Sequence, residues 1–203
     1  MTIRRGIFIL LLTLLFSHAG AQVTMRDVIR QMPDSLVPYL KANARLDFID
    51  FIDSGMKAQV SNDLGGKSQL TQLTDDYASF TLSAVSQLQM RLLSVDEPVD
   101  SARHILCMVR TYGGDLREST KRTNGSDLRE STIRFYTLQW RPLPSAPRIA
   151  LPPYAHQIQL SAQTPELTVL RDTSMDRPAN EEQKEIEAVL SKFKWDGKVF
   201  KIY

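Results

Sequence analysis

Two pairs of acidic side chains are the most direct candidates for chemistry in this sequence. Asp47 and Asp50 lie one helical turn apart, and Asp75 and Asp76 are adjacent. Paired carboxylates can hold a cation or act as the acid and base of a hydrolase. A glycan hydrolase needs two carboxyl groups that face each other across a cleft, about 5 to 9.5 Å apart. A solvated helix face and a turn, respectively, explain the two pairs without any chemistry.

Two further patterns resemble functional motifs but lack a necessary part. Gly65-Gly66-Lys67-Ser68 resembles the end of a phosphate-binding loop, yet Ser61 stands where that loop needs its first glycine. His104 and Cys107 could form a thiol dyad, but their odd spacing on one strand predicts opposite faces, and the surrounding run HILCMV predicts a buried, inert thiol. We therefore assign no catalytic, cofactor-binding or metal-ligating residue, and an enzyme remains possible but unsupported.

The first 21 residues are typical of a secretory signal peptide. Two arginines precede an apolar run from Ile7 to Phe16, and the small residues Ala19-Gly20-Ala21 follow. The run of about 10 apolar residues is too short to span a bilayer, which needs roughly 20. We expect cleavage after Ala21, without a lipoprotein cysteine at that point. The mature protein is then periplasmic or secreted and has no transmembrane segment.

The net charge and the cysteine content further limit the possible partners and the source of stability. The formal net charge is +2, and loss of the two leader arginines brings the mature chain to about zero. A balanced charge argues against a nucleic-acid or anionic-membrane partner. Cys107 is the only cysteine, so no intramolecular disulfide can form. Stability must come from a hydrophobic core, and we expect residues 22–203 to form a single domain.

The mature chain begins with helical patterns. Thr24 can cap a first helix that Pro33 ends, and a short turn follows in PDSLVPYL. The segment ANARLDFIDFIDSG predicts a longer helix whose apolar face carries Leu46, Ile49 and Ile52, with Gly55 at its C-terminal cap.

After Gly55 the apolar period changes to two. Residues 78–83 and 87–92 predict a hairpin, ARHILCMVRTY predicts a central strand buried on both faces, and STIRFYTLQW predicts the next strand. Near the end, Asn180 can cap a helix with Ile186, Val189, Leu190 and Phe193 on one face, and Asp196-Gly197 predicts a final hairpin. The predicted class is α+β: N-terminal helices, an antiparallel β-meander sheet, and a C-terminal helix plus β-hairpin.

The segment from residue 115 to residue 132 contains the string DLREST twice. Either the two copies form a functional tandem site or one is a duplication without a role. Excision of one twelve-residue unit leaves TYGGDLRESTIRFY, a plausible hairpin connection, and exposed hairpin tips tolerate insertions. We interpret the second unit as a duplication in a hairpin loop between the two long strands.

The segment from residue 141 to residue 154, RPLPSAPRIALPPY, is dense in proline and predicts an extended surface crossover. A proline-rich ligand for a recognition domain is the alternative interpretation.

Two strings carry a resemblance to a known family: MPDSLVPYLKANARLDFIDFIDSGMKAQV and LGGKSQLTQLTDDYASFTLS. They resemble an uncharacterised family of exported Bacteroidales proteins, classed only as a domain of unknown function. The resemblance implies the envelope of a gut or oral anaerobe and supplies no catalytic or binding residues. The connection between the two long strands is shorter in that family, which agrees with the duplication.

Three functions remain open from sequence. The first is a non-catalytic binding or interaction module of the periplasm or envelope, whose partner is an unknown envelope protein or glycan. The second is a hydrolase of envelope or dietary glycans or peptides that uses one of the carboxylate pairs. The third is a structural subunit of a surface assembly, which a contiguous exposed patch of Trp140, Trp195 and Tyr203 would favour.

Overall fold

The computed structural model describes residues 23–113, 130–145, 148–151, 156–172 and 187–203. In chain order the elements are α2 (Met25–Arg30), the 3-10 helix η1 (Asp34–Leu36), α3 (Ala42–Asp53), β1 (Gln59–Ser61), β2 (Lys67–Leu73), β3 (Tyr77–Ser83), β4 (Ser86–Val99), β5 (Ala102–Tyr112), β6 (Glu130–Tyr136), β7 (Pro142–Leu143), β8 (Gln157–Leu160), β9 (Glu166–Asp172), β10 (Glu187–Trp195) and β11 (Phe200–Ile202).

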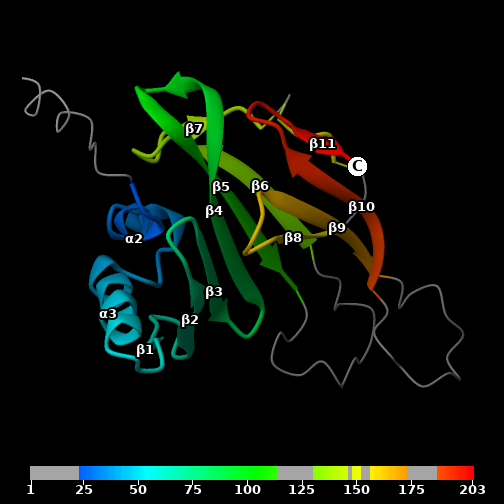
Figure 1. Cartoon of the computed structure of the whole chain (residues 1–203). Helices are drawn as coiled ribbons and strands as arrows, with labels where there is room; N and C mark the ends of the chain where they lie inside the picture. The colour runs from blue at the N-terminus through cyan, green and yellow to red at the C-terminus, as the bar shows by residue number, and fades with distance from the viewer. Residues whose placement is uncertain (1–22, 114–129, 146–147, 152–155, 173–186) are drawn as a thin grey trace, which may run out of the picture.

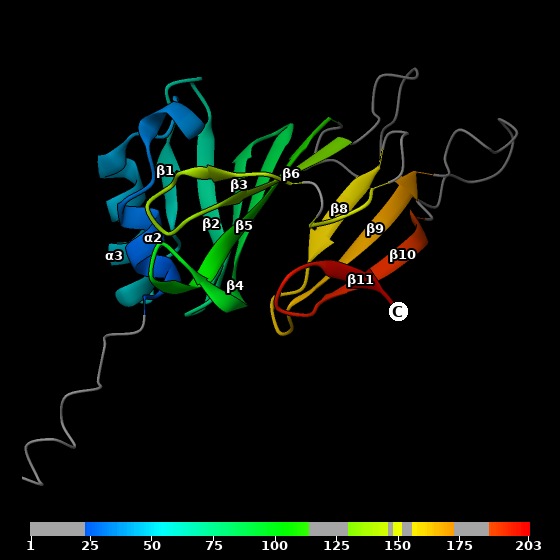
Figure 2. The same cartoon turned by 90° about the horizontal axis from the view of Figure 1, so that it is seen from above.

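These elements form three layers. Strands β1 to β7 pair in chain order as an antiparallel meander, here called the large sheet, and the order β11-β10-β9-β8 forms the small sheet (Figure 1). Seen from above, α2 and α3 lie on one side of the large sheet and the small sheet lies on the other (Figure 2). The predicted antiparallel meander is confirmed.

The alternation of side chains along the strands divides the large sheet between two cores. In β3 to β6 the buried apolar residues with even numbers belong to the core beneath the helices, and those with odd numbers belong to the core against the small sheet. β5 lies between β4 and β6, and its residues 105–109 are all buried. The central strand covered on both faces is confirmed.

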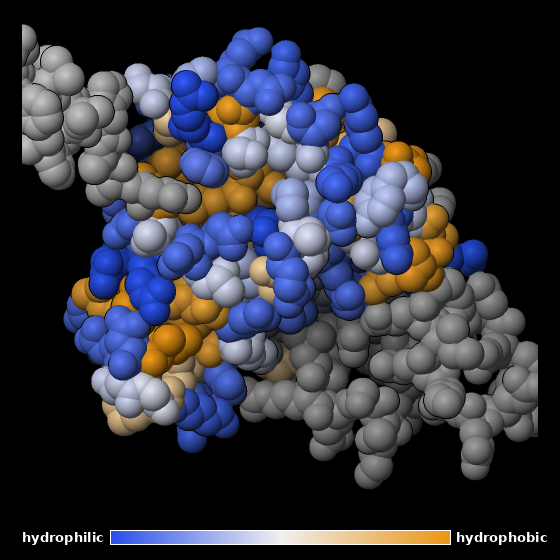
Figure 3. Space-filling model, in the orientation of Figure 1, coloured by the Kyte–Doolittle hydropathy of each residue, from blue (hydrophilic) through white to orange (hydrophobic). Residues whose placement is uncertain are grey.

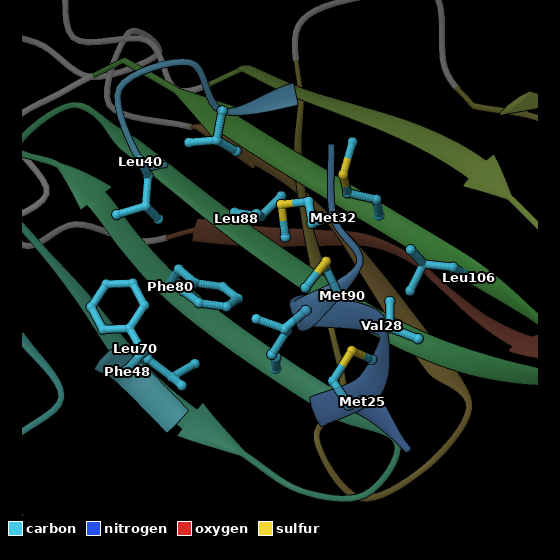
Figure 4. Packing of buried hydrophobic residues seen from close by; sticks show 14 of the residues in the cluster. Met25, Val28, Met32, Leu40, Phe48, Leu70, Phe80, Leu88, Met90 and Leu106 are labelled. Atoms are coloured by element: carbon cyan, nitrogen blue, oxygen red, sulfur yellow. The ribbon is translucent and has the colours of Figure 1, made fainter. Parts of the chain in front are cut away.

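The helix-side core packs the N-terminal helices onto the large sheet. Met25, Val28 and Phe48 from the helices meet Phe80 and Met90 from the strands (Figure 4). The predicted Thr24 cap is confirmed, and Asp27 completes a reciprocal capping box with Thr24 at the start of α2. The hydroxyl and backbone N–H of Thr24 lower the pKa of Asp27, with the backbone hydrogen bond contributing most.

The core between the sheets is rich in aromatic rings. Phe135 of the large sheet packs against Trp195 and Phe200 of the small sheet, with ring centroids 6.2 and 6.3 Å away. Cys107 is fully buried here, and burial strongly raises the pKa of its thiol. The predicted inert thiol is therefore confirmed.

Side chains of the large sheet also provide hydrogen-bond partners for the backbone at the edge of the small sheet. The backbone N–H of Leu160 donates to Gln89 Oε1, and that of Ile158 donates to Ser131 Oγ, both at 2.9 Å. Arg91, only 3% exposed, donates to the carbonyl of Ser161 at 2.6 Å and to Asp76 at 2.8 Å. Edge strand β8 is thus closed by side chains from the neighbouring layer.

The predicted α+β class is wrong, because the described elements are mostly strands in two antiparallel sheets. The predicted C-terminal helix is the main error: residues 187–195 form β10, paired with β9 and β11. Lys192, Phe193, Lys194 and Trp195 alternate in burial, and this period of two prevailed over the helical spacing because strands lie on both sides. The capping residue Asn180 lies outside the described residues.

The other helical predictions hold with one change of face. α2, η1 and α3 lie where the sequence places them, and Gly55 follows α3 with φ of +68°. Leu46, however, is 41% exposed, whereas Arg45 is buried. The Arg45 guanidinium donates to the backbone carbonyls of Leu40 and Met32 and pairs with Asp34, so it closes the loop between the two helices.

The final hairpin is confirmed at Asp196-Gly197. Asp196 Oδ1 accepts the N–H groups of Lys198 and Val199, and the Lys201 ammonium donates to its other oxygen. These bonds, that of Lys201 first, hold the pKa of Asp196 below its ordinary value. Gly197 has φ of +102° and lies directly against the Asp96 carboxylate of β4.

The repeat and the proline-rich segment need smaller corrections. The last three residues of the second DLREST copy, Glu130 to Thr132, are the start of β6 rather than part of the loop; residues 114–129 lie outside the described residues. Pro142 and Leu143 form the edge strand β7, where the missing N–H of proline is tolerated. Residues 146–147 and 152–155 of the predicted crossover lie outside the described residues.

Candidate functional site

The first carboxylate pair lies on an open helix surface. Asp47 and Asp50 are both exposed on α3, as a solvated helix face predicts. Two carboxylates that project from one helix into solvent do not face each other across a cleft, so this pair does not form the arrangement that a hydrolase needs.

The second pair forms a turn between β2 and β3. The Thr74 hydroxyl donates to Asp76 Oδ1, and Asp76 Oδ2 accepts from the buried Arg91 guanidinium at 2.8 Å. The carbonyl of Asp75 accepts the N–H of Met25 and anchors the start of α2. The Asp76 carboxylate therefore has structural partners, Asp75 is held through its backbone, and the turn interpretation is confirmed.

The remaining sequence motifs are also structural. Gly65 and Gly66 lie in the turn between β1 and β2, where Asn62 accepts the Gly66 N–H and donates to Ser68 and to the carbonyl of Leu82. His104 and Cys107 lie on opposite faces of β5, since Cys107 belongs to the core between the sheets. Within the described ranges, no group of three or more His, Cys, Asp or Glu side chains is arranged to hold a metal ion.

The aromatic patch expected of an assembly subunit does not form. Trp140 and Trp195 are 7% and 5% exposed, and only Tyr203 lies at the surface. The Trp140 indole N–H donates to the carbonyl of Val28 and completes the end of α2, while the Trp195 indole donates to that of Ser94. Apolar surface is scattered over the helices and the C-terminal strands and is divided by hydrophilic side chains (Figure 3).

A different set of residues forms an accessible surface of mixed chemistry. Arg110 and Tyr112 leave β5 on its even-numbered face, and Tyr39 reaches them from the segment between η1 and α3. The guanidinium carbon of Arg110 lies 4.7 Å from the ring centroid of Tyr112 and 5.9 Å from that of Tyr39. Tyr112 is 45% exposed. An arginine between two tyrosines offers charge and aromatic faces together.

The hydrogen bonds of Arg110 leave part of its donor capacity unused. Its two terminal nitrogens donate to the carbonyl of Leu36 at 2.9 Å and to the Tyr39 hydroxyl at 2.8 Å. A guanidinium has five N–H donors, so each terminal nitrogen keeps one further N–H; the Nε has no hydrogen-bond partner among the described residues but is buried and does not face a ligand. Because the Tyr39 oxygen accepts from Arg110, its own O–H remains available as a donor.

Neighbouring residues of β6 extend this surface. In the strand register, Arg110 lies opposite Thr132 and Tyr112 lies opposite Glu130, so Arg134 is diagonal to Arg110. Thr132, Glu130 and Arg134 are all exposed. Within the described part of the chain, Arg134 forms no ion pair. We call Tyr39, Arg110, Tyr112, Thr132 and Arg134 the Arg–Tyr face.

The sequence contained only a weak signal for this face. Arg110 and Tyr112 are two residues apart in a predicted strand, so their shared side was foreseeable. Neither the contact with Tyr39 nor the register that sets Arg134 beside Arg110 could be read from local spacing, because both depend on pairing between distant segments.

The fold and this face define the class: a layered, mostly antiparallel β-sheet protein with an exposed arginine–tyrosine surface. A family model described as "Protein of unknown function (DUF3256)" matches residues 17–156, and the chain belongs to that family. The matched range holds the helices and the large sheet. The predicted membership of a domain-of-unknown-function family is confirmed, while export and a Bacteroidales origin stay predictions.

Comparison with solved structures finds the same fold in "Structure of a domain of an uncharacterized protein from Porphyromonas gingivalis W83". The TM-score is 0.65 at 17% sequence identity, and the match covers 90% of this chain and 99% of that chain. At this identity the likeness concerns the fold alone. A search of curated proteins finds no match. No helix in the described residues is both long and apolar enough to cross a membrane.

Proposed function

We propose that this protein is exported and acts as a non-catalytic binding module, with the Arg–Tyr face as its binding surface. The observation that carries the proposal is the half-buried Arg110, which lies between Tyr39 and Tyr112 with donors to spare and beside the exposed Arg134. Aromatic and arginine side chains on an accessible face are characteristic of recognition surfaces.

The use of the other charged groups supports this assignment. Arg26, Arg45, Arg91 and Arg141 each pair with an aspartate. These pairs connect segments of the fold, whereas the donors of Arg110 reach only a carbonyl and a hydroxyl within the described residues. Among the described residues Arg110 therefore has no ion-pair partner, and its positive charge is available to an anionic group.

Export rests on the leader pattern. A charged start, a short apolar run and Ala19-Gly20-Ala21 support cleavage after Ala21 and a periplasmic or secreted product. N-terminal sequencing of the protein from its native cells should begin at Gln22 in the fraction outside the cytoplasm. A cytoplasmic product that starts at Met1 would contradict export.

A site-specific photo-cross-linking experiment tests the binding surface. A photo-reactive amino acid at Tyr112 should give adducts in the native envelope that the same group at Tyr203, an exposed tyrosine on the small sheet, does not give. The Arg134→Gln substitution should reduce the Tyr112 adducts. Identical adducts from both positions, or none from Tyr112, would contradict the proposal.

A further inference from the structure

The chemical groups on the Arg–Tyr face indicate the class of its ligand. This inference rests on the proposed binding function. We infer that the face binds a carboxylate-bearing saccharide, with Arg110 and Arg134 on the carboxylates and Tyr112 beneath a sugar ring. The same residues that define the surface thereby define its ligand.

Recognition at this place must use side chains. β5 is paired with β4 and β6 along this face. β7 pairs with β6 only at Phe135 and Tyr136, but two backbone groups on the rest of the β6 edge are already bonded, because the Ser131 N–H donates to the His156 carbonyl and the Ile133 carbonyl accepts from Ser145 Oγ. A peptide that adds as a further strand needs free backbone N–H and C=O groups. The face therefore suits a ligand that stacks on rings and accepts hydrogen bonds.

The two guanidinium groups suit separate carboxylates. Arg134 is diagonal to Arg110 across the strand pair, a relation that places the residues about 7–8 Å apart and their Cβ atoms somewhat closer. Arginine binds carboxylates through paired, charge-assisted N–H donors. Glu130 lies opposite Tyr112 and is the other diagonal neighbour of Arg110, so its negative charge directs an anionic ligand toward the side of Arg110 that faces Arg134.

The tyrosines supply the other half of saccharide recognition. A sugar ring has an apolar C–H face and a rim of hydroxyl groups, and the exposed Tyr112 ring can cover the former. The free O–H of Tyr39 can donate to the rim, and the exposed Thr132 oxygen, whose own O–H donates to the Arg110 carbonyl, can accept from it. Charge, stacking and hydroxyl groups thus occur together on two adjacent strands and one loop.

Calorimetric titration of the processed full-length protein with an oligogalacturonate tests this assignment. The matched ligand is the methyl-esterified oligomer of the same length, which keeps the rings and loses the charges. We expect the acid form to bind and the ester to bind at least about tenfold more weakly. Arg134→Gln should weaken binding of the acid form by a similar factor without loss of folding, because Arg134 is exposed and has no ion pair in the described residues.

Matched variants separate specific from general charge effects. Arg103→Gln removes an exposed arginine from the other end of β5 and should leave the affinity unchanged. Tyr112→Ala should weaken both the acid and the ester form. Melting temperatures of all variants, compared with the unsubstituted protein, identify any effect due to misfolding.

Other outcomes overturn the saccharide assignment in distinguishable ways. No binding of the acid form, equal binding of the ester, or equal losses in Arg103→Gln and Arg134→Gln contradict it. A polyglutamate peptide that binds more tightly than the oligogalacturonate, with the same variant pattern, contradicts the saccharide class but retains the proposed binding surface. Failure of the Tyr112 cross-linking experiment removes the surface itself.

Discussion

The two faces of the large sheet differ in how their polar groups are used. On the face toward the small sheet, Gln89, Arg91 and Ser131 each bond to the backbone of the other layer. On the helix face, Arg110 bonds to Leu36 of η1 and to Tyr39 in the segment after it, but Arg134 and Tyr112 lie open to solvent. α2 and α3 lie on that side of the large sheet (Figure 2).

This difference separates stability from recognition within one sheet. A sheet covered completely on one face can leave side chains exposed on the other without loss of its core. The arginine on each face illustrates the point: Arg91 is 3% exposed and joins two layers, whereas Arg110 is partly exposed and retains unused donors. We therefore expect substitutions on the two faces to affect different measurements.

The largest effect should come from the aromatic residues of the two cores. Phe135→Ala removes a fully buried ring that contacts Trp195 and Phe200, and should lower the free energy of unfolding by about 3–5 kcal/mol. Phe48→Ala on the helix face, where Phe48 packs on Phe80, should cost a similar amount. Urea unfolding measures both. Two separate transitions in either variant would show that the faces unfold independently.

The arginines provide a sharper contrast. Arg91→Met should destabilise the protein by about 2 kcal/mol, because Arg91 is 3% exposed and both its charged hydrogen bond to Ser161 and its pair with the half-exposed Asp76 are lost. Arg110→Met should cost about 1 kcal/mol, since Arg110 itself is only partly buried and water can replace its two hydrogen bonds. A larger loss of stability in Arg110→Met than in Arg91→Met would contradict the assignment of stability to the small-sheet face and of recognition to the helix face.

A third prediction concerns the contact of the small sheet with β4. Gly197→Ala should cost about 1–2 kcal/mol, because an added Cβ would lie 2.4 Å from Asp96 Oδ1 and φ is in the left-handed region. The double variant with Asp96→Ala should regain only the stability that is lost through the steric clash. Thermal unfolding of the single and double variants distinguishes the steric clash from backbone strain. Full recovery of stability in the double variant would argue against backbone strain.

The smallest effect should come from the duplicated unit. Deletion of residues 115–126 shortens the connection between Tyr112 and Glu130 to roughly a third of its length, which should stabilise the protein by about 1 kcal/mol through closure entropy. A Gly/Ser replacement of equal length should leave stability unchanged. Destabilisation by the deletion would show that the unit contributes contacts.

The register of β6 explains why a duplication can be tolerated there. Ile133 and Phe135 follow the second DLREST copy and enter the core between the sheets, whereas Lys121 and Thr123 stand at the matching positions after the first copy. A strand that began at the first copy would place a lysine and a threonine in the core, which is costly. Pairing through the second copy is therefore favoured.

Local patterns in the sequence determined the N-terminal helices, the capping box, the buried β5 and the Asp196-Gly197 turn, because each depends on residues within one or two turns or along one strand. The sequence also excluded a phosphate-binding loop and a His104–Cys107 dyad, and it predicted the family. These features need no information about distant partners.

Only the tertiary structure decided the state of residues 187–195 and the composition of the Arg–Tyr face. Residues 187–195 have both a helical and an alternating pattern, and pairing with β9 and β11 selects the strand. The Arg–Tyr face joins the segment after η1 to β5 and β6, and Arg110 binds Tyr39 across 71 positions of sequence. Contacts between distant segments depend on strand register and layer packing, which no local window of sequence specifies.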